Sequence, residues 1–506
     1  MKVERTPQYF LTWLLFVSIF ARVVLAFIYV RYPDIPVDMC YYVWAAKMLL
    51  TGEPLYKTLQ ENGILHPYGP LCGTVFAVWI TLFKEKWVFL NFPSIIFDCL
   101  IIVIIFYIIK ELVNEKVARF GSIFYAFSYL PLITSGAFGN DDQMYLFFML
   151  LSIYLLIKHR FSLGMVSFGI TLGFGVQMVP VLPAIAYYLY RKFGIKGLLK
   201  YFTLIPFTLF LILIPFYFNS GLDVLYPYSG KPFSSGPLFV NMLSPLNFIR
   251  VTIAFCINAI HYLSTHTVIP KEMNPIPAYP HSHHPLNLFF NQVAAPVVLL
   301  FGVIGIIWYM FRFKIENREI ELVRNSFLWI FGALIFSRCV TDLYFNWLLP
   351  SFLILILFKE QIKFVDFKLK KQEILGIILT FIGLLNTLHI SAQEPNLSSI
   401  DRVRAFLTPI LVPLGTYLML YRTKISKSWA LLMFGFTVPG LKPAIMLFKP
   451  FLVRFIPEIP ISYGTYLSYF VQYSLNILGF GDSICMDNMD CKEYASALNR
   501  KGRKSE

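Results

Sequence analysis

The sequence predicts an all-α membrane protein, a bundle of transmembrane helices with a long first outer loop. Of its 506 residues, 57% are hydrophobic and only 14% are charged, and its mean hydropathy is +0.65. Soluble domains carry roughly a quarter charged residues. Apolar runs of about 20 residues, the length that crosses a bilayer as a helix, recur along the chain.

These runs predict about 11 to 14 membrane spans. The strong candidates lie near residues 9–30, 87–109, 119–138, 201–218, 292–311 and 373–390. The weaker candidates are shorter or broken by proline, and lie near 143–157, 163–190 (a short pair), 326–341, 343–358, 403–421, 428–447 and 462–480. The first run is too long for a signal-peptide core and lacks a small-residue cleavage site, so we expect an uncleaved anchor.

No flexible linker or internal repeat divides the chain. We therefore expect one polytopic membrane domain over residues 1–481, followed by a polar cytoplasmic tail over 482–506. The seven cysteines are scattered and contain no CxxC motif, so neither a disulfide framework nor a zinc site is predicted.

The positive charge indicates membrane orientation rather than nucleic-acid binding. The formal net charge is +15, but Lys and Arg cluster at the ends of apolar runs instead of forming one stripe. The clusters fit a single cytoplasmic face, with a cytoplasmic N-terminus, if the run 71–83 is an interfacial helix and not a span. The outer segments are then 31–86, 139–142, about 219–291, 338–344 and about 391–402.

The first outer loop contains the strongest candidate for a catalytic base. After Asp38, the spacing of aromatic and apolar residues predicts an amphipathic interfacial helix that ends near Gly52 and Pro54. An aspartate at the membrane surface can act as general base for an acceptor hydroxyl, because it meets both a water-soluble acceptor and a lipid-held donor. On residue type alone, a solvated N-cap acid is the more common role.

A second acidic site follows at Asp141 and Asp142, between two apolar runs on the same predicted face. These carboxylates suit orienting an acceptor, sharing the role of base, or binding a cation, and a polar turn that caps the next helix is the alternative. Asp98 lies inside an apolar run, where an acid is costly and either pairs with another group or faces an aqueous cavity.

The segment 337–350 combines ionisable and aromatic side chains at a predicted outer helix junction. Arg338 suits a lipid phosphate, and Tyr344 and Trp347 suit a groove for a sugar or a prenyl chain. An interfacial aromatic belt with an Arg338–Asp342 pair is the alternative. The histidines of 281–284 have no fixed fourth ligand, so a solvated surface tract is favoured over a metal site.

Taken together, these segments resemble the GT-C superfamily of membrane glycosyltransferases. The first-loop segment Asp38–Tyr56 and Tyr68-Gly69-Pro70-Leu71 carry the most specific part of the resemblance. Four further segments match in order: Pro93-Ser94 to Asp98, the acids after Gly139, Gln177-x-x-Pro180 and Tyr344-x-x-Trp347-x-x-Pro350. The resemblance covers residues 9–358, with further spans over 373–481, and is closest in outline to mannosyltransferases that use dolichyl-phosphate mannose.

The resemblance implies an inverting transferase that moves a sugar, with mannose favoured, from a polyprenyl (dolichyl) phosphate to an acceptor hydroxyl at the outer or lumenal face. Asp38 would be the base. Asn91 and Gln177 stand where members often carry a basic residue, so the implied phosphate contacts move to Arg338, Lys231 or elsewhere. Further candidates for donor contacts are His66, Tyr68, Tyr344 and Trp347. Asp38 is followed by Met39 and Cys40 instead of a second acid, so a divalent cation is compatible with the site but not required.

The resemblance implies a polyprenyl-linked sugar donor, a glycolipid, glycan or protein acceptor, and membrane lipid as partners, with no nucleic acid. The location would be the plasma membrane in a prokaryote and the ER membrane in a eukaryote. Two other classes remain: a transporter or lipid flippase, which also needs many spans and intramembrane charges, and an assembly subunit without activity. The missing repeat and the acidic first loop favour the enzyme.

Overall fold

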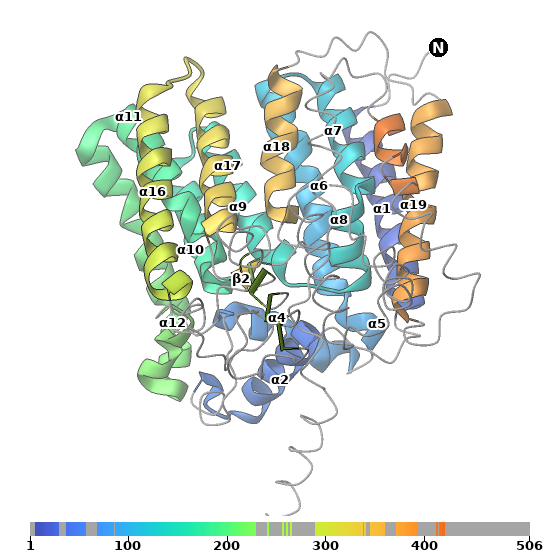
Figure 1. The fold of residues 1–506 in the computed structure, drawn as a ribbon, viewed down its shortest axis with the longest axis horizontal. Helices are drawn as coiled ribbons and strands as arrows, with labels where there is room; N and C mark the ends of the chain where they lie inside the picture. The colour runs from blue at the N-terminus through green and yellow to red at the C-terminus, as the bar shows by residue number, and fades with distance from the viewer. Residues whose placement is uncertain are drawn as a thin grey trace, which may run out of the picture.

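In a computed structural model, the chain forms a bundle of apolar helices with two shorter helices across one end (Figure 1). The structure describes residues 6–29, 37–56, 68–84, 87–228, 240–241, 289–336, 339–340, 345–359, 371–392, 411–412 and 414–419, with short stretches within 253–265. By length and composition, three helical stretches of this part are able to cross a membrane: Pro7–Ile28, Val88–Leu112 and Val176–Tyr228. The predicted all-α membrane fold is confirmed.

The first half of the bundle begins with α1 (Pro7–Tyr29), which packs against α6 (Phe92–Leu112), itself preceded by α5 (Trp87–Leu90). Helix α7 (Glu115–Phe127) starts where the Asn114 side chain accepts a hydrogen bond from the Val117 N–H (2.9 Å), an N-cap. Helices α9 (Asp142–Ile157), α10 (Phe161–Phe174) and α12 (Leu204–Ser220) pack successively beside α6.

The predicted short pair at 163–190 is confirmed as α10 and α11 (Leu182–Phe202), separated by the 3₁₀ turn η2 (Val176–Val181). A second 3₁₀ segment, η3 (Gly221–Tyr228), follows α12. The later described helices are α16 (Ala295–Arg312), entered through the π-helix η5 (Phe290–Ala294), then α17 (Arg318–Phe336), α18 (Phe345–Lys359) and α19 (Lys371–Ala392). The predicted tail and the spans near 428–447 and 462–480 lie outside the described residues.

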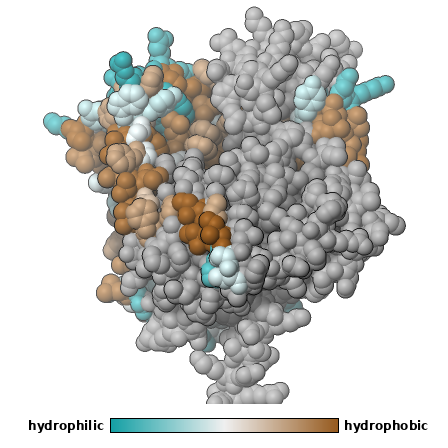
Figure 2. All heavy atoms as spheres, viewed as in Figure 1, coloured by the Kyte–Doolittle hydropathy of each residue, from teal (hydrophilic) through white to brown (hydrophobic). Residues whose placement is uncertain are grey.

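The surface of the bundle is apolar where lipid would contact it. In α16 the exposed side chains include Leu300, Phe301, Ile304 and Trp308. Figure 2 shows brown, hydrophobic residues over the side where α16 and α11 lie. Large exposed hydrophobic side chains at this density are unfavourable in water, and they fit a surface solvated by lipid.

The two helices across one end of the bundle are α2 (Val37–Thr51) and α4 (Pro70–Phe83), which pack against each other (Figure 1). Both come from the predicted first outer loop. The run 71–83 is therefore a helix lying across the end of the bundle and not a further member of it. A two-residue parallel strand pair, β1 (Val240–Asn241) with β2 (Cys339–Val340), joins two other predicted outer segments.

Candidate active site

The acidic turn, residues 139–142, is held in place by the start of α6. A π-helix, η1 (Leu132–Ala137), follows the short α8 (Tyr129–Pro131) and leads into Gly139, which has φ +64°. The Asn91 amide donates hydrogen bonds to the carbonyl oxygens of Gly136 (2.9 Å) and Ala137 (3.0 Å), and the Ser94 hydroxyl donates to the Asn140 carbonyl. A Cβ at position 139 would lie 2.5 Å from Asn91 Oδ1, so glycine is required there both for its conformation and for space.

Asp141 and Asp142 are buried in this turn, with 1% and 3% of their surface exposed. Asp141 stands at the N-cap position of α9, but its side chain makes no capping hydrogen bond. Asp142 Oδ1 accepts a hydrogen bond from the Tyr145 hydroxyl. Asp142 is thus hydrogen-bonded to a side chain of α9 itself, and the partner of Asp141 comes from another element, as described next.

Tyr42 connects the first-loop helix α2 to the acidic turn. Its hydroxyl donates to Asp141 Oδ1 at 2.7 Å, although the two residues are 99 positions apart in the sequence. Its ring stacks on Phe76 of α4 at 5.0 Å and meets Tyr68 edge-on at 5.0 Å. Met39 also reaches this turn, since its Cε would lie 2.5 Å from a Cβ at Gly139. The first two turns of α2 thus lie against the acidic turn.

Asp38 lies in the first turn of α2, one residue before Met39 and one helical turn before Tyr42. Positions four apart in a helix are neighbours on one face, with a rise of about 6 Å between them. The Asp38 side chain lies outside the described part of the structure. Its helix position is nevertheless beside the acidic turn, so the two candidate acidic sites belong to one region of the molecule.

Tyr68 begins the segment that docks α4 onto the bundle. It forms an isolated bridge with Gly175, and the Gly69 N–H donates to the Phe174 carbonyl at 2.7 Å. The Tyr68 carbonyl accepts a hydrogen bond from the Tyr56 hydroxyl (3.0 Å). Burial raises the pKa of Tyr56 well above its usual value, so this hydroxyl stays protonated and able to donate.

Of the residues predicted to contact the donor, Trp347 is described and buried in α18, where its ring meets Tyr145 edge-on at 5.6 Å. Because Tyr145 also donates a hydrogen bond to Asp142, this contact places Trp347 near the acidic turn. His66, Lys231, Arg338 and Tyr344 lie outside the described residues, although β2 begins immediately after Arg338. The His281–His284 tract is outside them too.

The buried Asp98 belongs to an ion pair whose partner the sequence analysis missed. Arg22 of α1 contacts Asp98 Oδ2 through Nε and Nη2, both at 2.7 Å, and both side chains are fully buried. Ser135 of η1 donates to Asp98 Oδ2 (2.8 Å), and Tyr125 of α7 donates to Oδ1 (2.9 Å). An arginine in the first apolar run was the available signal, because a charge inside a span is expected to have a partner.

This network joins α1, α6, α7 and η1 next to the acidic turn. Because Ser135 precedes Gly139 by only four residues, the ion pair fixes the π-helix that leads into that turn. Asp98 is therefore a structural residue in this arrangement, which is one of the two roles left open above.

A metal site is not evident in the described part of the chain, where no cluster of three His, Cys, Asp or Glu side chains occurs. The residues present do supply hard oxygen donors, the two carboxylates of the acidic turn, and such donors suit Mg²⁺ or Ca²⁺ better than zinc.

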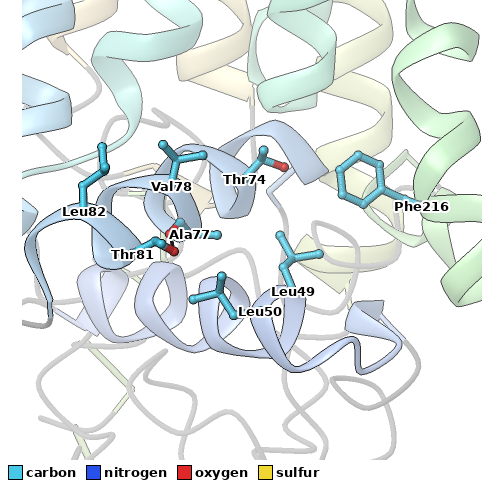
Figure 3. A pocket seen from close by; sticks show the side chains of 8 residues that line it. All are labelled: Leu49, Leu50, Thr74, Ala77, Val78, Thr81, Leu82 and Phe216. Carbon is cyan, nitrogen blue, oxygen red and sulfur yellow. Dashed lines mark hydrogen bonds between the residues drawn. The ribbon is translucent and has the colours of Figure 1, made fainter.

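An apolar groove runs between α2 and α4 at the same end of the bundle (Figure 3). It has a volume of about 400 Å³. Its lining comes from Leu49 and Leu50 of α2, from Thr74, Ala77, Val78, Thr81 and Leu82 of α4, and from Phe216 of α12. The groove offers hydrocarbon contacts on the helix that carries Tyr42 and position 38.

A comparison with protein families agrees with the resemblance drawn from the sequence. The family model described as dolichyl-phosphate-mannose-protein mannosyltransferase matches residues 66–218, which include α4, α6 and the acidic turn. A crystal structure of ArnT from Cupriavidus metallidurans bound to undecaprenyl phosphate aligns with a TM-score of 0.45 and 10% identity, over 94% of this chain and 77% of that one. No curated protein sequence matches the chain. The resemblance to membrane glycosyltransferases that use polyprenyl-phosphate sugars is thus confirmed over the matched segment.

Replacing Tyr42 tests whether α2 is held by the acidic turn. Tyr42→Phe keeps the ring contacts but removes the hydrogen bond to a carboxylate, and such bonds contribute roughly 1.5–3 kcal/mol. We expect the free energy of unfolding, measured in mixed micelles, to fall by about that amount. The matched control is Tyr107→Phe, about 24 Å along α6 from Asn91, for which no comparable loss is expected. If the two substitutions lower the free energy of unfolding equally, the hydrogen bond from Tyr42 does not hold α2 on the acidic turn.

Proposed function

We propose that this protein is a glycosyltransferase that moves a sugar from a polyprenyl-phosphate carrier to an acceptor hydroxyl, with inversion at the anomeric carbon. The observation that carries the proposal is the hydrogen bond from Tyr42 to Asp141. It joins the helix that carries Asp38 to an acidic turn inside the segment matched by the mannosyltransferase family model.

The proposed reaction assigns one proton transfer to the protein. Asp38 takes the proton of the acceptor hydroxyl while that oxygen attacks the anomeric carbon and the bond from this carbon to the phosphate oxygen breaks. The products are the glycoside and the polyprenyl phosphate, which leaves as a phosphate monoester. The additional negative charge on the phosphate needs a cation, the role proposed for Arg338 and Lys231.

Substrate positioning supplies the rest of the proposed catalysis. Asp141 and Asp142 orient the acceptor, and Tyr68 lies near Tyr42 where it would contact the donor. The groove between α2 and α4 fits part of the hydrocarbon chain of the carrier (Figure 3). The two carboxylates of the turn would hold a divalent cation, if one binds, and the cation would stabilise the negative charge on the phosphate. Mannose remains the sugar that we propose.

The orientation that we propose places the N-terminus in the cytoplasm and the α2/α4 end of the bundle at the outer or lumenal face. The clusters of Lys and Arg in the sequence support this orientation, because such clusters are retained on the cytoplasmic side.

The test is transfer by the purified protein in lipid nanodiscs. Radiolabelled polyprenyl-phosphate mannose and glucose are offered with membrane-lipid, glycan and peptide acceptors. We expect product from one of the two donors, with mannose preferred. Failure to transfer any sugar by a well-folded protein would favour the transporter or flippase class. Asp98, an intramembrane charge of the kind that this class needs, is paired with Arg22 in the structure.

A further inference from the structure

Three buried polar side chains meet beside the acidic turn, and the proposed mechanism does not use them. Thr134 of η1, Gln143 of α9 and Asn346 of α18 are all fully buried. The Gln143 amide nitrogen donates to Thr134 Oγ1 at 2.6 Å, and the Asn346 amide nitrogen donates to the same oxygen at 3.4 Å. Two amides from separate helices thus converge on one hydroxyl.

The hydrogen-bond pattern fixes which way both amides face. The Thr134 hydroxyl has a single proton, which it donates to the Leu130 carbonyl at 2.8 Å. It can therefore only accept from Gln143 and Asn346, so each amide presents its NH₂ group to Thr134. Both amide oxygens are then left as acceptors, and neither has a hydrogen-bond partner among the described residues.

Two such acceptors in one place indicate a ligand that donates hydrogen bonds. A buried acceptor without a partner costs roughly 1–3 kcal/mol. From covalent geometry, each amide oxygen lies within about 6 Å of Thr134 Oγ1, so one small molecule can reach both. Amide oxygens repel anions, which disfavours a phosphate group as their ligand and leaves groups that donate O–H or N–H hydrogen bonds.

The neighbours of these amides favour a sugar. Gln143 directly follows Asp142, and Asn346 directly precedes Trp347, whose ring meets Tyr145. Carboxylates accept hydrogen bonds from hydroxyls, while aromatic rings provide contact area for the C–H faces of a pyranose. The Tyr145–Trp347 contact and the two amides both lie where α9 and α18 meet, so this region of the bundle holds the kinds of side chain that bind a ligand rich in hydroxyl groups.

We propose that Gln143 and Asn346 form a subsite that accepts hydrogen bonds from sugar hydroxyls and thereby selects the sugar. This inference rests on the proposed function and goes beyond it, because it names residues that determine specificity. The hydroxyls belong to the transferred sugar or to a sugar of the acceptor, and the two cases share the same chemistry.

The experiment compares the intact substrate with its monodeoxy analogues. Wild type, Gln143→Met, Asn346→Leu and the control Ser152→Ala are assayed for kcat/KM in nanodiscs. Ser152 is a buried residue on the same helix as Gln143. Wild type is expected to prefer the intact sugar over one analogue by about tenfold to a hundredfold, since that analogue leaves a buried acceptor unpaired. Gln143→Met or Asn346→Leu should bring this ratio close to one, and Ser152→Ala should leave it unchanged.

The outcomes separate the subsite from the proposed function. Loss of discrimination with deoxy donors assigns the subsite to the transferred sugar, and loss with deoxy acceptors assigns it to the acceptor. If both variants slow the intact and deoxy substrates equally, the amides hold internal water or serve packing only, and the inference is overturned while the proposed function stands. If wild type transfers no sugar at all, the proposed function fails and the inference fails with it.

Discussion

Asp38→Asn is expected to lower kcat/KM for sugar transfer by roughly a hundredfold to ten-thousandfold, the contribution typical of a positioned general base. The amide keeps the size of the side chain but cannot take a proton from the acceptor hydroxyl. Position 38 lies in the first turn of α2, where Met39 and Tyr42 contact the acidic turn. The effect should appear in kcat, because the substituted group acts in the transition state and contributes little to ground-state binding.

A matched control separates the loss of a base from the loss of an outer-loop acid in general. Asp34→Asn makes the same chemical change four residues earlier in the sequence, and it is expected to leave kcat within a fewfold of wild type. The measurement is single-turnover transfer from radiolabelled polyprenyl-phosphate mannose in nanodiscs, with thermal unfolding as the check on folding. Full activity in a folded Asp38→Asn protein would remove Asp38 from the mechanism and leave Asp141 and Asp142 as the acids to test.

The sequence predicted the fold well because bilayer crossing is a local property. An apolar run of sufficient length forms a helix wherever it stands, since its backbone groups must pair internally in lipid. The interpretation of 71–83 as an interfacial helix, and of 163–190 as a short pair, depended on charge placement and on breaks in the run. Both agree with the observed α4, α10 and α11.

The contacts that build the candidate site were much less predictable. Tyr42 and Asp141 are 99 residues apart, and Thr134 and Asn346 are 212 apart, so no local pattern links them. Tyr42 belongs to an aromatic stripe typical of any interfacial helix. Gln143 directly follows Asp141 and Asp142 in the sequence, and no pattern distinguishes it. Which polar residues meet is determined by how the helices pack, which a single sequence does not specify.

Asp98→Asn is expected to lower the free energy of unfolding by about 3–5 kcal/mol, because it leaves the Arg22 guanidinium buried without its counter-charge. Arg22 Nε and Nη2 both lie 2.7 Å from Asp98 Oδ2, and neither residue is exposed. Among the described residues, the guanidinium also donates to the Ser18 and Ala126 carbonyls, at 3.3 and 3.2 Å, and to the Ser135 hydroxyl, at 3.1 Å, and none of these acceptors carries a full charge. The measurement is reversible denaturation in mixed micelles.

The double variant Arg22→Met with Asp98→Asn is expected to recover most of this loss. It removes both charges together, and replacing a buried ion pair by neutral groups is often close to neutral for stability. The asparagine still offers an oxygen to the hydroxyls of Tyr125 and Ser135, which keeps η1 attached to α6. If Asp98 acts only through structure, the double variant should also recover sugar transfer to within about tenfold of wild type. A stable double variant that transfers no sugar would instead show that transfer requires the Asp98 charge. Asp98 would then be a functional intramembrane acid.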